Sequence, residues 1–330
     1  MARKWITGID IGHYSTKAVL LAFDKSDVKV TNHMELYHGD AIFADHTTLK
    51  YQDTVKKLQK LKKLTSIFRR NASIALPHDA AVSKILTIDS ALTGRELEYA
   101  IYQKMESLIP FPLDSVALDY TADSGFNSHL QTFRVHIAKQ EIVDDWCNVV
   151  HKLGFKSQVV ATAAHALMAM HQQIIRHSPQ YKNWLLLDIG YQQMTICSVM
   201  GFDVEGYKTW YLPCLKKESE PHYGVEYKSD TQLIGDAVCQ KLLPQLQRYR
   251  SLSQGEKIEG ILLSGGKALS EGIDSVLTKQ CQLPCRLLSP NKLINCPARN
   301  NLPLSESYVT AIGIALLGAH WIQEVGDERC

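Results

Sequence analysis

The chain has 330 residues, of which 45% are hydrophobic and 21% are charged, and its formal net charge is +2. This composition argues against a disordered chain and a polytopic membrane protein, and the small net charge calls for no polyanionic partner such as nucleic acid. The length exceeds one typical domain and suits two lobes of about 150 residues each.

The first predicted element is a hairpin from Trp5 to Leu21, in which two apolar strands flank a turn at residues 12–15. Asp10, at the end of the first strand, can hold a hydrated magnesium ion, and Gly12 lets the backbone approach an oxyanion. Hydroxyl and ammonium donors follow at Ser15, Thr16 and Lys17. Asp and Gly also favour ordinary turns, so this hairpin alone does not establish a phosphate site.

A third strand is predicted from Val28 to Tyr37, and a helix from Tyr51 to Arg70. The apolar residues of this helix recur at helical spacing, at Val55, Leu58, Leu61, Leu64 and Phe68. Its other face is strongly basic, with Lys50, Lys56, Lys57, Lys60, Lys62, Lys63, Arg69 and Arg70 against the single acid Asp53. This pattern is typical of a core stripe with a solvated basic face, and it also suits contact with an anionic membrane leaflet.

An inserted subdomain is predicted from residue 82 to residue 154, after a strand at Ala72 to Leu76. Its expected elements are strands at 82–88, 116–120 and 131–138 and helices at 93–108 and 141–153. Residues 1–81 and 155–180 would then form the first lobe, and residues 181–330 the second. A strand at 154–160 and an apolar helix at 163–175 would lead from the insert to the second lobe.

The second lobe is predicted to begin with a repeat of the first hairpin, at residues 183–200. Asp188 and Gly190 correspond to Asp10 and Gly12, which indicates a duplicated fold with a ligand between the halves. A later strand runs into a turn at Ser264, Gly265 and Gly266, where the backbone can approach a nucleotide. The remaining predictions are strands at 208–212 and 283–288 and helices at 234–249, 269–281 and 308–322.

These three motifs, in this order, resemble those of the actin, sugar-kinase and Hsp70 superfamily. Two further stretches, ALPHDAAVSKI at 75–85 and LIPFPLDSVALDY at 108–120, resemble the PilM family of cytoplasmic actin-like proteins of type IV pilus assembly, relatives of FtsA. The resemblance covers about residues 5–320 and implies an α/β, actin-like, duplicated two-lobe fold with an FtsA-type inserted 1C subdomain. It also implies ATP with Mg, the metal held through water by Asp10 and Asp188. The implied nucleotide-binding residues are Asp10, Gly12, Tyr14, Ser15, Thr16, Lys17, Asp188, Gly190, Gln192, Gln193, Ser264, Gly265, Gly266 and Lys267.

Three departures from the family pattern concern the nucleotide. The first phosphate turn carries His13 and Tyr14, and the second carries Tyr191, Gln192 and Gln193, where relatives have small residues. No Gly-Gly pair lies between residues 213 and 234, where the family has its adenosine loop, and alanines at 161 and 163 stand where relatives tend to have acids. Both a nucleotide-binding cleft and a nucleotide-free scaffold therefore stay open.

The resemblance also implies a partner, the N-terminal cytoplasmic tail of a PilN-like bitopic membrane protein, and through it pilus motor and platform proteins. The expected site is a groove between the first lobe and the insert, formed by the strand at 81–84 and the helix end at 109–112. Its proposed contacts are Val82, Lys84, Ile109, Pro110, Phe111 and Pro112. The prolines make a rigid wall beside a strand edge that could accept an extended peptide. The alternative is that the I-P-F-P run only ends a helix and packs the insert.

Other classes of function find less support. A small-molecule kinase of the same superfamily and an FtsA-like filament protein are the alternatives, but no separate catalytic carboxylate and no terminal amphipathic membrane helix stand out in the sequence. The eight cysteines contain no CxxC pair, which indicates reduced cytosolic thiols, with a metal site at Cys281, Cys285 and Cys296 as the less favoured interpretation. Neither a secretory signal nor a membrane-spanning run is predicted, so membrane association would be peripheral, at the cytoplasmic face of the inner membrane.

Overall fold

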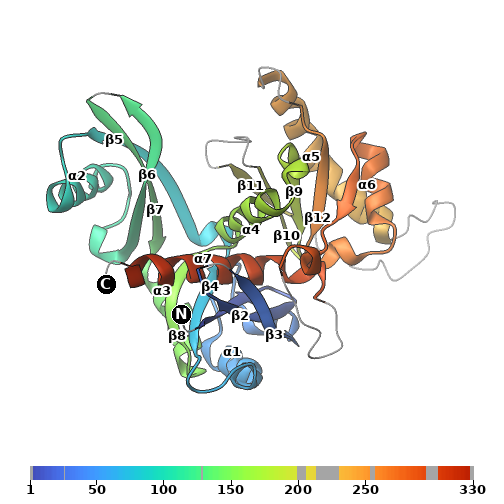
Figure 1. Ribbon diagram of the computed structural model, residues 1–330, viewed down its shortest axis with the longest axis horizontal. Helices are drawn as coiled ribbons and strands as arrows, with labels where there is room; N and C mark the ends of the chain where they lie inside the picture. Colours follow the sequence, from blue (N-terminus) through green and yellow to red (C-terminus); the bar gives the residue numbers. More distant parts are fainter. Residues whose placement is uncertain are drawn as a thin grey trace.

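The computed structural model describes residues 3–25, 27–127, 129–198, 206–212, 230–252, 257–294 and 304–327. Two five-stranded sheets form the centres of two lobes, and a three-stranded sheet forms an inserted subdomain beside the first lobe (Figure 1). The segment between residues 213 and 229, where an adenosine loop was expected, lies outside the described residues.

The first sheet has the strand order β3-β2-β1-β4-β8. Its strands are β1 (Lys4–Ile11), β2 (Ser15–Phe23), β3 (Val28–Tyr37), β4 (Asn71–Leu76) and β8 (Lys156–Thr162). The first three strands are antiparallel, whereas β4 and β8 run parallel to β1. The predicted hairpin from Trp5 to Leu21 is therefore β1 and β2.

The second sheet repeats this topology in the order β11-β10-β9-β12-β13. Its strands are β9 (Trp184–Ile189), β10 (Gln193–Cys197), β11 (Tyr207–Tyr211), β12 (Gly260–Ser264) and β13 (Cys285–Leu287). Again the first three strands are antiparallel and the last two parallel to the first. This repetition confirms the predicted duplicated, actin-like α/β fold.

Two helices, α4 (Ala163–His177) and α7 (Val309–Asp327), lie between the two sheets (Figure 1). One buried cluster combines residues of both sheets with these helices, and includes Ile6, Leu21, Leu167, Met170, Leu186, Leu262, Val309 and Ile312. The helices cross where a Cβ at Gly313 would overlap the backbone carbonyl of Ala166. At Gly8, β1 approaches α7 closely enough that a Cβ would overlap the carbonyl of Ala311.

The first lobe covers the other face of its sheet with α1 (Tyr51–Leu58) and α3 (Gln140–Lys152). Trp146, Val149 and Val150 of α3 are buried in the same cluster as Ile9 and Ile74 of the sheet. Because α3 completes this core, we place the end of the insert near residue 139, whereas the sequence placed it at residue 154.

The predicted helix from Tyr51 to Arg70 differs from the observed structure. Its α-helical part ends at Leu58, and a 3₁₀ helix, Gln59–Lys63, and a turn follow. Leu58, Leu61 and Leu64 are buried as expected, but Phe68 is 90% exposed. The 3₁₀ turn changes the angular spacing of the side chains, so the apolar stripe does not continue to Phe68.

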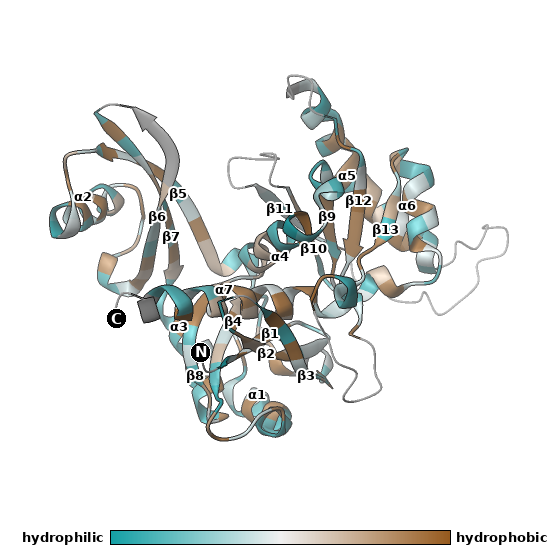
Figure 2. Cartoon of the chain, viewed as in Figure 1, coloured by the Kyte–Doolittle hydropathy of each residue, from teal (hydrophilic) through white to brown (hydrophobic). Residues whose placement is uncertain are grey.

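The second lobe carries α5 (Asp230–Leu252) and α6 (Ile273–Cys281) on its outer side. In Figure 2, β12 is brown along most of its length, whereas α5 and α6 also carry teal segments, as expected for helices with one face in solvent. Cys239 of α5 and Cys281 of α6 approach to 3.6 Å between their sulfur atoms, in the buried contact between the helices. Among the described helices, none is long and apolar enough to span a bilayer.

The insert consists of a sheet in the order β5-β7-β6 and one helix, α2 (Gly94–Glu106). Its strands are β5 (Ala81–Asp89), β6 (Val116–Asn127) and β7 (Leu130–Lys139). Phe133, Val135 and Ile137 alternate along β7 and share a separate core with Ile101 and Met105 of α2. The insert therefore has its own core, and one face of its sheet is left without a helix of the insert.

The crossing of α4 and α7 leads to a first prediction. Gly313→Ala should lower the free energy of unfolding by about 2 kcal/mol, because the methyl group forces the two helices apart. Urea unfolding followed by circular dichroism measures this change. Gly266→Ala is the matched control, since a Cβ there meets nothing within 4 Å. Equal stability of the two variants would contradict the close crossing.

A second prediction concerns His171, which is fully buried on α4. Burial lowers its pKa from 6.5 to about 4. Between pH 6.5 and pH 4, His171 is therefore protonated in the unfolded chain but neutral in the folded chain. Protonation of the unfolded chain lowers the stability of the fold as the pH falls towards 4. In His171→Leu the loss of stability between pH 7 and pH 4.5 should be smaller by about 2 kcal/mol.

Urea unfolding at the two pH values measures that loss, with the exposed His177→Leu on the same helix as control. An identical pH dependence in all three proteins would show that His171 does not titrate as its burial requires.

Candidate functional site

The duplicated hairpins bring two carboxylates together where the two lobes meet, a region referred to below as the cleft. Asp10 lies near the end of β1, opposite Lys17 of β2, and Asp188 lies near the end of β9, opposite Thr195 of β10. The two turns close identically: the Gly12 amide donates to the Ser15 carbonyl at 3.2 Å, and the Gly190 amide donates to the Gln193 carbonyl at 2.8 Å. The local pairing that makes each hairpin thus positions one aspartate on each side of the cleft.

The electrostatics show that these carboxylates share one environment. Burial raises the pKa of Asp10 to about 6, with Lys17 opposing the shift and the charges of Asp188 and Glu35 adding to it. Burial also raises the pKa of Asp188, against the hydrogen bond from Ser264 and the charge of Lys17. Ser264 at the end of β12 donates to Asp188 Oδ1 at 2.8 Å. Asp10 and Asp188 are partly buried and face one lysine, and a hydrated divalent cation bound between them would stabilise their charged forms.

The predicted phosphate donors of the first hairpin already have protein partners. Ser15 donates to Glu35 at 2.6 Å, and Lys17 lies 2.8 Å from Ser15 Oγ and 3.3 Å from Glu35 Oε1. The Thr16 hydroxyl lies 2.9 Å from His38 Nε2 in the buried interior. Glu35 of β3 therefore neutralises Lys17, which was expected to bind phosphate. Ser15 and Lys17 would have to leave Glu35 before they could bind a ligand.

Aromatic rings close the cleft where the two phosphate turns meet. The rings of Tyr14 and Tyr191 lie 5.2 Å apart between centroids, and the Lys267 ammonium lies 5.6 Å from the Tyr191 ring. Gln192 and Gln193 continue this wall: the Gln192 carbonyl accepts from the Leu212 amide at 2.8 Å, and Gln193 pairs with Tyr211. The large side chains of Tyr14 and Tyr191, noted at these turns in the sequence, thus lie between the lobes.

The glycine turn after β12 has the form expected for close backbone approach. Gly265 has a φ of 92°, and a Cβ there would overlap the backbone of Ile189 in the neighbouring strand. Gly266, by contrast, faces open space, with nothing within 4 Å of the Cβ position. Among the described residues, no group of three or more His, Cys, Asp or Glu side chains is arranged to hold a metal ion, and Cys296 of the proposed thiol group lies outside them.

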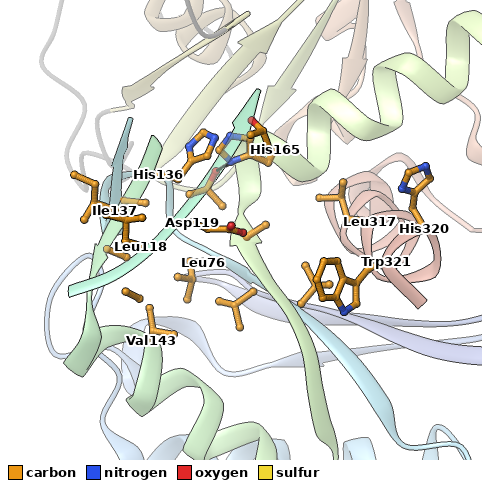
Figure 3. Close-up of a pocket in the computed structure, with 18 of the residues that line it drawn as sticks. Leu76, Leu118, Asp119, His136, Ile137, Val143, His165, Leu317, His320 and Trp321 are labelled. Atoms are coloured by element: carbon orange, nitrogen blue, oxygen red, sulfur yellow. Dashed lines mark hydrogen bonds between the residues drawn. The ribbon is translucent and has the colours of Figure 1, made fainter. Parts of the chain in front are cut away.

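A second site is an apolar groove between the first lobe and the insert, with a volume of about 380 Å³. In Figure 3, Leu118, Ile137 and Val143 line one side, Leu317, His320 and Trp321 of α7 line the other, and Asp119 lies between them. The groove lies where β6 and β7 of the insert meet β8 and α7, because residues of all four elements line it. Trp321 is 49% exposed in this wall.

Two strand edges border this groove, and neither pairs with another strand of the described residues. β8 is the last strand of the first sheet, and β6 is the last strand of the insert sheet. Four consecutive residues of β8, from Val159 to Thr162, line the groove. Because successive side chains point to opposite faces of a strand, this unbroken run means that the backbone edge itself faces the groove. Such an edge can accept an extended chain by main-chain hydrogen bonds.

The charged lining of the groove is acidic. Among the described lining residues, Asp119 and Glu324 are the only Asp, Glu, Lys or Arg side chains. Two histidines meet at its upper end, where the rings of His136 and His165 lie 4.6 Å apart (Figure 3). The groove thus combines apolar walls, free backbone edges and negative charge.

The partner-binding residues expected from sequence lie outside this lining. Val82 and Lys84 are exposed on β5, at the opposite edge of the insert sheet, and their side chains point to the face that carries α2. Phe111 lies in a separate depression with Lys139, whose ammonium is 5.6 Å from the ring, and Ile109 packs on the insert core. Pro110 and Pro112 flank Phe111 between α2 and the strand β6.

The sequence predicted a groove between the first lobe and the insert but did not identify Asp119, the β8 edge or Trp321 as its lining. One sequence feature could have indicated this lining. Near its end, the last predicted helix, which is otherwise apolar, carries the large aromatic Trp321 beside the polar His320 and Glu324.

Comparisons with known proteins agree with this architecture. A sequence model of the family described as "Type IV pilus assembly protein PilM" matches residues 8–203, more than half of the chain. A solved structure of the PilM-PilN type IV pilus biogenesis complex is similar, with a TM-score of 0.70 at 17% identity, over 95% of this chain and 98% of that chain.

Two more distant structures also match. The ethanolamine utilization protein EutJ of Carboxydothermus hydrogenoformans has a TM-score of 0.48 at 13% identity, over 96% of this chain and 90% of that chain. The cytoplasmic domain of EpsL, from the type II secretion system of Vibrio cholerae, has a TM-score of 0.47 at 10% identity, over 95% of each chain. With the family match and the duplicated fold together, the chain belongs to the PilM family of type IV pilus assembly proteins.

Proposed function

We propose that this chain is a scaffold of the type IV pilus inner-membrane platform, which binds the extended N-terminal cytoplasmic tail of a PilN-like bitopic protein in the groove between the first lobe and the insert. The observation that carries the proposal is the pair of free strand edges, β6 and β8, beside an apolar lining. The similar solved structure is itself a PilM-PilN complex, which supports a partner of this kind.

The charge of the groove supports the same partner. Cytoplasmic segments next to a membrane-spanning helix are rich in Lys and Arg, and the end of such a tail carries an amino group. Asp119 and Glu324 offer the complementary charge in the groove. Apolar residues of the tail would pack against Leu317, Trp321 and the side chains of β8, while its backbone pairs with a strand edge. The pilus motor and other platform proteins would connect through this partner.

The third prediction tests the groove with a fluorescein-labelled synthetic peptide of the tail of the PilN homologue from the same organism. Asp119→Lys should weaken binding at least about tenfold, because it replaces attraction by repulsion. Trp321→Ala should weaken binding about tenfold by removing an aromatic contact. Fluorescence anisotropy measures both affinities, and circular dichroism confirms folding.

Phe111→Ala and Val82→Arg serve as matched variants outside the groove, and their affinities should equal that of the wild type. Loss of binding in these two variants with retained binding in Asp119→Lys and Trp321→Ala would move the site to the surface expected from sequence.

A nucleotide site in the cleft is a second candidate, favoured by one specific observation. Asp10, Asp188 and Lys17 meet between the lobes, and Gly266 faces open space beside them. We propose that MgATP binds here as a regulatory ligand, with the metal held through water by the two aspartates. The bound cation would neutralise the two acids, and the β12 turn at Ser264, Gly265, Gly266 and Lys267 would face the nucleoside. Opening of the contact between Tyr14 and Tyr191 would make room for the phosphates.

The fourth prediction follows from that geometry. Millimolar MgATP should raise the melting temperature of the wild type, and more so that of Tyr14→Ala, in which the phosphate turns are less crowded. Asp10→Ala should remove this shift because the metal loses one anchor, and Gly266→Val should remove it by filling the open space. Differential scanning fluorimetry measures the shifts, and Gly266→Ala is the steric control.

Isothermal calorimetry on the same proteins gives the affinities. No heat and no thermal shift in either the wild type or Tyr14→Ala would contradict the nucleotide proposal and leave a nucleotide-free scaffold.

A further inference from the structure

A tight turn between the 3₁₀ helix Gln59–Lys63 and β4 presents two large apolar side chains to solvent. The Arg69 amide donates to the Ser66 carbonyl at 3.1 Å, so Ile67 and Phe68 occupy the two central positions of a hydrogen-bonded turn. Ile67 is 68% exposed and Phe68 is 90% exposed. Turn centres normally carry Gly, Pro, Asn, Asp or Ser, so two adjacent large hydrophobic residues at this place call for an explanation.

The turn is held firmly at its base. Leu61 and Leu64 are buried in the first-lobe core, and Asn32 donates to the Leu64 carbonyl at 2.8 Å. On the far side, the Arg69 guanidinium stacks over the Trp5 ring at 3.8 Å, and the Thr65 hydroxyl donates to the Arg69 carbonyl at 3.1 Å. The two apolar side chains are thus displayed by an anchored turn.

The adjoining surface is basic. The segment that leads into the turn carries the exposed lysines Lys56, Lys57, Lys60, Lys62 and Lys63. No ion pair involves these lysines among the residues that the structure describes. Between residues 50 and 70, Asp53 is the single acid. Closely spaced lysines beside an apolar tip are complementary to a surface with negative charge on its exterior and an apolar layer beneath it.

We propose that this basic turn, formed by Lys56 to Arg69 with Ile67 and Phe68 at its tip, is a membrane-docking site for anionic phospholipid. The lysines attract the lipid head groups, and the two apolar side chains enter the boundary between head groups and acyl chains. Figure 1 shows α1, at the start of this segment, at the end of the first lobe remote from α2 of the insert. Among the described residues that line the groove, none comes from residues 56–69, so the docking site and the groove are separate surfaces.

Flotation with vesicles of phosphatidylethanolamine and phosphatidylglycerol tests the proposal, with phosphatidylcholine vesicles as the neutral comparison. The wild type should float only with the anionic vesicles. Lys60→Glu/Lys62→Glu/Lys63→Glu should reduce the partition coefficient by at least about a hundredfold, since each charge near the surface contributes appreciably. Ile67→Ser/Phe68→Ser should reduce it by about tenfold, because less apolar surface is buried.

Two matched controls separate this site from general effects of charge and hydrophobicity. Lys241→Glu/Lys257→Glu/Lys279→Glu changes three exposed lysines of the second lobe, and Tyr99→Ser removes an exposed aromatic residue of α2. Both should bind like the wild type. In Phe68→Trp, brominated phosphatidylglycerol should quench fluorescence beyond the quenching of the wild type, which reports insertion directly.

Three results would overturn the proposal. These are equal binding to neutral and anionic vesicles, unchanged binding in both the charge-reversal and serine variants, and absence of additional quenching in Phe68→Trp. Equally tight binding to duplex DNA that is insensitive to Ile67→Ser/Phe68→Ser would identify a general polyanion site instead.

Discussion

The close crossing of α4 and α7 is the contact on which the rest of the structure depends. Because residue 313 is glycine, the backbones of the two helices touch, and both sheets can pack on the same pair of helices. This shared core sets the position of β1 relative to β9. Asp10 and Asp188, which lie near the ends of those strands, face one another only because the strands are held in this way.

The groove depends on where the insert leaves and rejoins the first lobe. The chain departs after β4 and returns as β8, the neighbouring edge strand of the same sheet. The insert is therefore tied beside a sheet edge that no further strand covers, and its own edge strand β6 comes to border the same space. Exposed edges are normally protected because they invite pairing with other chains. Here α7 and the insert sheet surround the edge, so that access is restricted to a chain narrow enough to enter the groove.

The cleft and the groove meet different physical requirements. In the cleft, the rings of Tyr14 and Tyr191 join the lobes, and the partly buried Asp10 and Asp188 face Lys17, which is paired with Glu35 inside the first lobe. A further link between the lobes comes from Tyr211, whose hydroxyl donates to the Asp79 carboxylate. The groove, in contrast, leaves apolar walls and strand edges exposed to solvent. The groove is thus lined by accessible apolar surface, whereas the meeting point of the lobes is filled by side chains of the chain itself.

The sequence alone determined the duplicated hairpins, most strand positions and the presence of an insert, because strand periodicity and turn chemistry act over a few neighbouring residues. It also located Asp10, Asp188 and the glycine turn at the ends of strands, because each follows an apolar run that a local pattern predicts. Only the tertiary structure decided that α3 belongs to the first-lobe core, that Glu35 pairs with Lys17, and that Asp119 and Trp321 face one groove. It also placed Phe68 in solvent, against its helical spacing, since burial of Leu61 and Leu64 in a 3₁₀ turn redirected the chain. Such outcomes depend on contacts between residues far apart in the sequence, which no local pattern records.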